Sequence, residues 1–169
     1  MNYEANKLYL TEKAVNEVDD WLRANLATYV DQVNNQFGDD GRAITITTPS
    51  TGDIAEWRWQ MMPPLPALTI LPQEASALED LNGYIMSRHP LVVVVADTDA
   101  DQNVLRRKLL RQAVALIQCL LAGAAAGAFV MFWQDARVMA RYSSIAIVDE
   151  TFFADAQVYI EIQIEETYG

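Results

Sequence analysis

Three acidic residues alternate directly after a strongly hydrophobic run: Asp97, Asp99 and Asp101. Carboxylates at this spacing are typical of a calcium-binding loop, which takes ligands from positions 1, 3 and 5. That loop also needs glycine at its sixth position and glutamate at its twelfth, where this chain has Gln102 and Lys108. The spacing therefore excludes an EF-hand and favours a turn into a helix, whose positive N-terminus each carboxylate stabilises by about 0.3–1 kcal/mol.

The same turn resembles the active-site loop of haloacid-dehalogenase phosphatases, in which a nucleophilic aspartate and a second aspartate follow a buried strand. On that resemblance Asp97 and Asp99 would support magnesium-dependent phosphoester hydrolysis. The family also uses a downstream lysine and an acidic pair on a larger parallel sheet. No lysine follows Lys108, and the pair Asp149-Glu150 comes late in the chain. A small Asp-dependent phosphatase-like enzyme is therefore the alternative from a different functional class.

Other residue types suited to catalysis are few. The single cysteine, Cys119, lies in an apolar helical pattern, where we expect it to be packed, and it excludes a disulfide framework. The single histidine, His89, precedes Pro90 at the start of a predicted strand, and Ser143-Ser144 is only an adjacent pair. Gly-x-Ser-x-Gly, GxxxxGK[ST] and GxGxxG motifs are missing from the sequence. We predict a protein that is not an enzyme, with no catalytic residue, cofactor or metal.

One segment combines the side chains that dominate protein interfaces, namely aromatic residues, methionine and arginine: Trp57, Arg58, Trp59, Met61 and Met62. The two tryptophans alternate, so both rings point to one side of an extended arm. Pro63 to Pro66 favour a loop rather than a central strand after it. We predict a protein interface here, with packing into the domain's own core as the alternative.

Three arginines in the helix predicted after Asp101 are the second interface candidate: Arg106, Arg107 and Arg111. Arg107 and Arg111 are one turn apart and are predicted on the side opposite the apolar face. The chain is otherwise acidic, with 12 Lys+Arg against 23 Asp+Glu and a net charge of −11. The electrostatic field of a protein with this negative charge repels phosphate backbones and anionic membranes. We therefore expect these arginines to pair with acidic residues of a neighbouring subunit, or else to form a solvated helix face.

The hydrophobic patterns predict an α+β fold in one domain over residues 1–169. Residues 11–35 have helical periodicity with Thr11 as a cap, and a second helix is expected to end at Gly123. The continuous apolar strand is expected to be covered on both faces. The predicted sheet is small, mixed or antiparallel, and packs against the long N-terminal helix and the central helix. Predicted strands cover residues 43–48, 67–71, 91–96, 137–148 and 158–164, and a short helix covers 75–86.

The longest uncharged run, Gln112 to Gln134, reaches the length of a membrane span. Its leucine-rich half ends at Leu121 and is followed by glycine and alanine, including Gly123 and Gly127. We predict a buried helix and a small-residue loop, with no membrane partner. A membrane-inserted segment is the alternative.

Three segments share their order with a known family. A proline, a small residue and an aliphatic strand occur at Pro66 to Ile70, and a strand, acidic turn and helix run from Val92 to Arg107. An alternating strand from Val158 to Ile164 comes near the end. With the N-terminal helix, this order of elements resembles the tail-terminator (tail-completion) proteins of long-tailed bacteriophages.

The resemblance implies a structural virion protein whose copies form a ring, a hexamer, that ends the tail tube and joins tail to neck. The implied partners are further copies, the tail-tube protein and a neck or stopper protein, with assembly in the host cytoplasm. DNA would pass through the ring without specific binding, since an acidic bore releases no counterions. Another neck component, such as a head-completion, stopper or connector subunit, is the nearest alternative.

Overall fold

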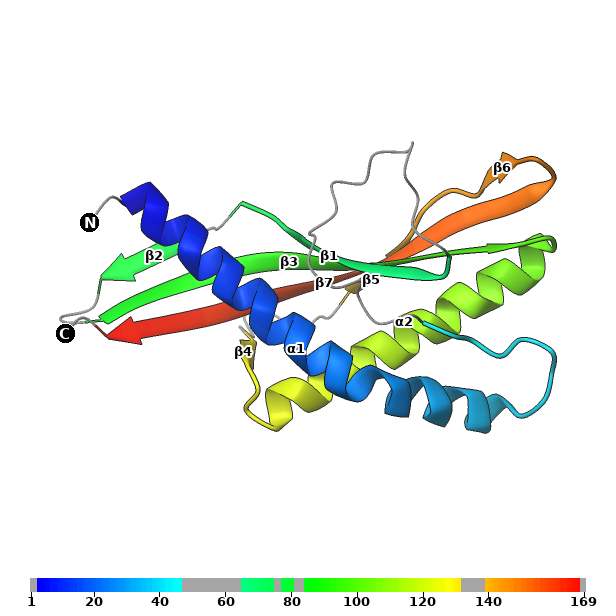
Figure 1. Cartoon of the computed structure of the whole chain (residues 1–169), viewed down its shortest axis with the longest axis horizontal. Helices are drawn as coiled ribbons and strands as arrows, with labels where there is room; N and C mark the ends of the chain where they lie inside the picture. Colours follow the sequence, from blue (N-terminus) through cyan, green and yellow to red (C-terminus); the bar gives the residue numbers. More distant parts are fainter. Residues whose placement is uncertain (1–2, 47–64, 75–76, 81–83, 132–138, 168–169) are drawn as a thin grey trace.

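The computed structural model describes residues 3–46, 65–74, 77–80, 84–131 and 139–167. In this part of the chain two helices, α1 (Tyr3–Phe37) and α2 (Gln102–Ala125), pack on one face of a seven-stranded sheet (Figure 1). All strand pairs are antiparallel. The α+β class is confirmed, and the sheet is antiparallel rather than mixed.

The sheet is organised around two long strands that pair along their whole length, from Tyr84 opposite Thr167 to Asp99 opposite Phe152. Two shorter strands pair with the free edge of the first long strand, and three pair with the free edge of the second. The seven strands are β1 (Ala67–Pro72), β2 (Ala77–Asp80), β3 (Tyr84–Asp99), β4 (Val130–Met131), β5 (Met139–Tyr142), β6 (Ala146–Val148) and β7 (Thr151–Thr167). The strands predicted at 67–71, 91–96 and 158–164 are confirmed in position. The segment predicted at 137–148 does pair with β7, but as two strands, β5 and β6, separated by residues 143–145, while residues 137–138 lie outside the described residues.

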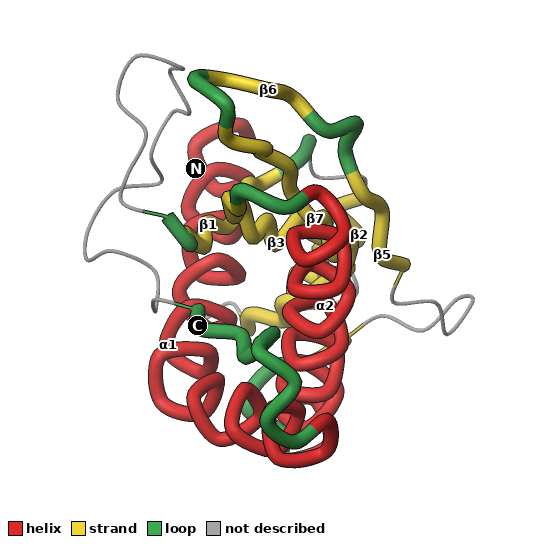
Figure 2. The backbone as a smooth tube through the Cα atoms, turned by 90° about the vertical axis from the view of Figure 1, so that its right-hand side faces the viewer, coloured by secondary structure: helices red, strands yellow, loops and turns green. Residues whose placement is uncertain are grey.

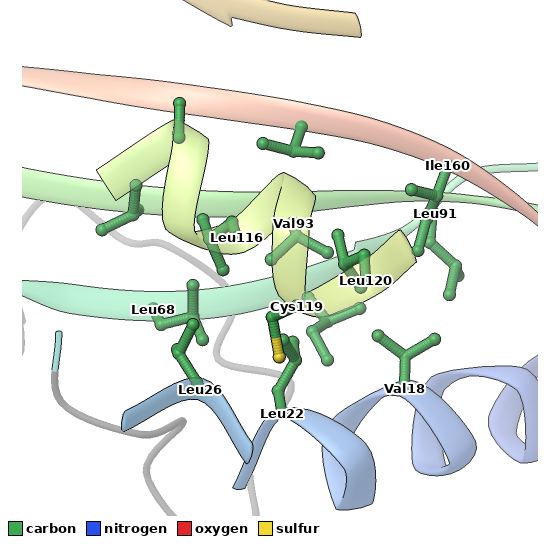
Figure 3. Close-up of a cluster of buried hydrophobic side chains, with 14 of the residues drawn as sticks. Val18, Leu22, Leu26, Leu68, Leu91, Val93, Leu116, Cys119, Leu120 and Ile160 are labelled. Carbon is green, nitrogen blue, oxygen red and sulfur yellow. The ribbon is translucent and has the colours of Figure 1, made fainter. Parts of the chain in front are cut away.

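The core forms where the helices meet the inner face of the sheet. Alternation along the strands turns odd-numbered residues of β3 and even-numbered residues of β7 toward the helices. Figure 3 shows these side chains meeting those of both helices: Val18, Leu22, Leu26, Leu68, Leu91, Val93, Leu116, Cys119, Leu120 and Ile160. Val92 and Val94, on the opposite face of β3, are also buried, so the prediction of a strand covered on both faces is confirmed.

The helix predicted over residues 75–86 is wrong. Residues 77–80 form β2, which pairs with β3 from Ala77 opposite Arg88 to Asp80 opposite Ile85. Ala-Leu-Glu-Asp has good local helix preference, but pairing with the edge of an existing sheet overrides preferences of a few tenths of a kcal/mol.

The strand predicted over 43–48 is wrong for residues 43–46, which form no strand. The Ile44 N–H donates to Asn34 Oδ1, and Asn34 Nδ2 donates to the Ile44 carbonyl, both at 2.8 Å. The side chain of Asn34 thus takes the place of a partner strand and buries Ile44 against the core. Residues 47–48 and the predicted interface segment 57–62 lie outside the described residues.

The helix boundaries differ from the predicted ones at two of three tested points. Thr11 does not cap α1, because the helix begins at Tyr3. Asp101 caps α2 as expected, since its Oδ1 accepts from the N–H of Asn103 and of Val104. Gly123 does not end α2, which continues to Ala125.

Gly123 has a packing role instead. A Cβ at this position would lie 2.7 Å from the Phe129 ring and 2.8 Å from Trp21 Nε1. Trp21 also donates from Nε1 to the Cys119 carbonyl at 2.8 Å. Only a residue without a side chain lets α2 approach α1 this closely.

Candidate functional site

The inward-facing side of α2 carries a buried arginine. Arg111 Nη1 donates to Asp40 Oδ1 at 3.0 Å and to the Arg42 carbonyl at 2.7 Å, while its Nη2 donates to Asp40 Oδ2. Its guanidinium also lies 4.1 Å from the centre of the Phe37 ring. The prediction that Arg111 lies on the side opposite the apolar face is wrong, because its side chain is buried and fixes the turn after α1 to α2.

The hydrogen bond from Arg111 lowers the pKa of Asp40 from its ordinary 3.8 to about 2, with further lowering from the Arg42 backbone and from both positive charges. Asp40 therefore stays ionised at any pH at which the protein is expected to work. The pair is an internal connection between the Gly38–Arg42 turn and α2.

Asp97 faces the same inner side and is buried. Its Oδ1 accepts from the Thr98 N–H and its Oδ2 from Gln112 Nε2, both at 2.7 Å. Burial raises the pKa of Asp97, and these two donors limit the increase. Both carboxylate oxygens are therefore engaged with the protein, at a position that solvent hardly reaches.

The other two carboxylates of the acidic turn also have contacts within the fold. Asp99 accepts from Lys108 Nζ at 2.6 Å, and Asp101 caps α2. Within the described residues, no group of three or more His, Cys, Asp or Glu side chains is arranged to hold a metal ion. This geometry agrees with the interpretation of the turn as the start of a helix.

His89 lies within β3, rather than at the entrance to a strand, and its fully buried side chain faces α1. Its Nδ1 lies 2.9 Å from Thr11 Oγ1, and its Nε2 lies 2.6 Å from Ser87 Oγ. Because both ring nitrogens are bonded and the site is closed, the arrangement anchors α1 to the sheet.

The solvent-facing side of α2 is unusually apolar. Leu110 is 51% exposed, Val114 42% and Leu121 37%, at spacings of four and seven residues that put them in one row along the helix. Arg106 and Arg107, both exposed, precede this row by one turn. We call these five residues the α2 outer face. Within the described part of the chain, neither arginine has an ion-pair partner.

A second exposed apolar site lies at the end of the β6–β7 hairpin. Ile147 is 66% exposed and Val148 53%, and Asp149 and Glu150 form the turn that follows. We call these four residues the hairpin tip. Asp149 and Glu150 have φ of 47° and 63°, a conformation that costs a residue with a side chain about 1–2 kcal/mol. Asn-Gly would form this two-residue turn with less strain, so the acidic side chains are present despite a local cost.

The two sites lie on different elements of one chain. Figures 1 and 2 show β6 toward the top of each view, and in Figure 1 the N-terminal end of α2 lies at the same end of the molecule as the β6–β7 hairpin. The sequence analysis named Arg106 and Arg107 of the α2 outer face as interface candidates, but it missed the apolar residues of that face and the whole hairpin tip. The available signal was the spacing of Leu110, Val114 and Leu121, which puts them in one row off the buried face of the helix.

By length and composition α2 is apolar enough to cross a membrane, as is the core helix of many soluble proteins. Half of its most apolar stretch is buried inside this molecule, and within it Arg111 bonds to Asp40 and Gln112 to Asp97. The predicted uncharged run also does not continue as one helix, because α2 ends at Ala125 and a turn leads to β4.

Comparison with known proteins gives no family for this chain: neither the protein-family models nor the curated proteins contain a match.

Proposed function

We propose that this protein is the subunit of a homo-oligomeric ring, a hexamer, that ends the tail tube of a long-tailed bacteriophage and joins the tail to the neck. The α2 outer face carries the proposal. It combines a row of exposed apolar side chains with two arginines that lack an ion-pair partner in the described part of the chain. A surface of this composition is typical of a protein contact.

The order of elements supports the same assignment. A long first helix, a strand with an acidic turn into a second helix, and a long alternating last strand follow one another as they do in the tail-terminator family. Within the acidic turn, the carboxylates of Asp97, Asp99 and Asp101 bond to the fold itself. This favours a role in assembly over a role for the turn in hydrolysis.

The net charge of −11 supports a ring through which DNA passes. A surface with this charge repels phosphates, so DNA gains no counterion-release energy from contact with it. The partners in the proposal are other copies of the chain, the tail-tube protein and a neck or stopper protein, in a virion assembled in the host cytoplasm.

Two measurements together test the proposal. Light scattering of the purified chain is expected to give the mass of a ring, and gold-labelled antibody against the chain is expected to mark the junction of head and tail in electron micrographs of phage particles. A chain that is monomeric in solution and missing from purified particles would contradict the proposal.

The gold-labelled antibody also distinguishes a tail terminator from the nearest alternative, another neck component. A head-completion, stopper or connector subunit would stay with isolated heads after tails are removed, whereas a tail terminator would stay with isolated tails. Magnesium-dependent phosphoester hydrolysis that is lost in Asp97→Asn would instead support the phosphatase-like enzyme.

A further inference from the structure

We infer that the hairpin tip of one copy binds the α2 outer face of the next copy. The inference deepens the proposed function, on which the ring itself rests, by naming the two surfaces that join neighbouring subunits. Both surfaces are incomplete in a single chain, because each exposes large apolar side chains beside charges that no described residue neutralises.

The charges of the two surfaces are complementary. The α2 outer face has Arg106 and Arg107, and the helix from Gln102 to Ala125 contains no acidic residue. Two copies of α2 packed against each other would therefore leave the arginines without carboxylates. The hairpin tip provides two carboxylates, on Asp149 and Glu150, next to two apolar side chains.

The spacing of apolar and charged groups also agrees. Along the helix the rise from Arg107 to Leu110 is about 5 Å. Along the hairpin, Asp149 follows Ile147 by two residues, so their Cα atoms are at most about 7 Å apart. The flexible arginine side chain covers the difference, so apolar contact and ion pairing can occur together.

The placement of the two surfaces makes the contact head-to-tail. The tip and the outer face are different regions of the chain, one at the turn between β6 and β7 and the other along α2. Each subunit therefore gives its tip to one neighbour and its helix to another, and a contact of this kind closes into a ring when the rotation per subunit allows it. The strained turn conformation of Asp149 and Glu150 agrees with a tip that is shaped for its partner.

Cross-linking between two single-site variants tests the contact. Val114→Cys and Ile147→Cys are purified separately, mixed, and treated with a short bismaleimide. The native Cys119 does not interfere, because it is buried and its thiol has a pKa raised by burial to about 11. A covalent dimer is expected in the mixture and not in either variant alone. Gln36→Cys, which is exposed on α1, replaces Val114→Cys in the matched control and is expected to give no dimer.

Charge reversal provides the second readout. Arg107→Glu is expected to weaken association about tenfold, and Glu150→Arg to do the same. The double variant is expected to recover most of the affinity, which a loss of folding would not do. Light scattering at several concentrations measures all three variants against the unchanged chain.

The outcomes separate this inference from the proposed function. If the unchanged chain forms rings and the mixture gives no cross-link, the contact is wrong and the ring stands. A dimer formed equally by Val114→Cys alone would show α2 packing on α2 and would also overturn the contact. A cross-link in the mixture from a chain missing from phage particles would support the contact and contradict the proposed function. If the unchanged chain stays monomeric and the mixture of the two cysteine variants gives no cross-link, the contact is overturned.

Discussion

The two sides of α2 carry the same kinds of residue with different partners. The inner side places Leu109 and Leu116 in the core and pairs Arg111 with Asp40 of the same chain. The outer side has Leu110 and Val114 in solvent, beside Arg106 and Arg107 without ion-pair partners among the described residues. On the inner side of α2, folding buries the leucines and pairs the arginine. On the outer side, a second chain could bury the apolar side chains and pair the arginines. Under the proposed function, residues of the inner side fold the chain, and residues of the outer side contact a second copy.

The adjacent leucines Leu109 and Leu110 give the largest expected difference. Leu109→Ala should lower the free energy of unfolding by about 2–5 kcal/mol, because Leu109 is 2% exposed and its removal leaves a cavity. Leu110→Ala should change it by less than about 0.5 kcal/mol and weaken association instead. Urea unfolding of dilute protein measures the first effect, and light scattering of concentrated protein measures the second. Equal losses of stability in both variants would remove the distinction between the two sides.

Gly123→Ala tests how closely the inner side is packed. An alanine in place of glycine inside a helix ordinarily stabilises by about 1 kcal/mol. Here the new methyl group would overlap Phe129 and Trp21, so we expect a net destabilisation of about 1–3 kcal/mol. Leu121→Ala, on the outer side two residues away, is the matched control and should leave thermal unfolding almost unchanged. A stabilised Gly123→Ala variant would mean that the two rings move aside easily.

Removing the charge of Arg111 is expected to have a smaller effect on stability, and removing the charge of Arg107 is the control. Arg111→Met should lower the melting temperature at pH 7, whereas Arg107→Met should not. Because the folded-state pKa of Asp40 is lowered to about 2 from 3.8, its ion pair stabilises the protein above about pH 4 and is lost as the pH falls to about 2. The difference between Arg111→Met and the unchanged chain should therefore shrink over that interval. A difference that is constant from pH 7 to 2 would show that Arg111 stabilises by packing alone.

Asp97→Asn is expected to have the smallest effect, seen as a change in pH dependence. Burial raises the pKa of Asp97, so the folded state holds this proton more tightly than the unfolded state. Its ionised form therefore costs stability at neutral pH, and that cost decreases as the pH falls through the raised pKa toward 3.8. Asp97→Asn should lack this gain on acidification, as measured by thermal unfolding between pH 7 and 4.

Asp99→Asn is the control for that measurement. Burial alone would raise the pKa of Asp99, but hydrogen bonds from Lys108 and from the Asp101 backbone together lower it. Its contribution to the pH dependence therefore has the opposite sign. If Asp97→Asn and Asp99→Asn changed the pH dependence of thermal stability in the same direction, the opposite pKa shifts assigned to Asp97 and Asp99 would be contradicted.

The spacing of apolar residues predicted the helices and strands in which buried side chains recur at a regular interval. The stripe of α1 from Val15 to Val33, the apolar run in β3 and the alternation of Val158 to Ile164 all lie where the patterns indicated. Periodicity works here because each side chain's environment depends on its own position in a helix or strand.

The remaining features depend on contacts that the spacing of apolar residues does not show. Arg111 turns inward because Asp40, 71 residues earlier, lies where its guanidinium can reach it. β2 is a strand because β3 offers it an edge, and His89 is buried because Thr11 and Ser87 bond to both ring nitrogens. None of these contacts follows from hydrophobic periodicity, so the inward position of Arg111, the strand β2 and the burial of His89 could not be predicted from the sequence.

The pairing of β3 with β7 has a mechanical consequence. Sixteen residues of β3 lie in unbroken antiparallel register with β7, over a length of about 50 Å. Tension applied along the strands, at opposite ends of the pair, would load this whole ladder in shear, so that many hydrogen bonds must break at once. A chain built in this way resists stretching along the strand axis more strongly than across it.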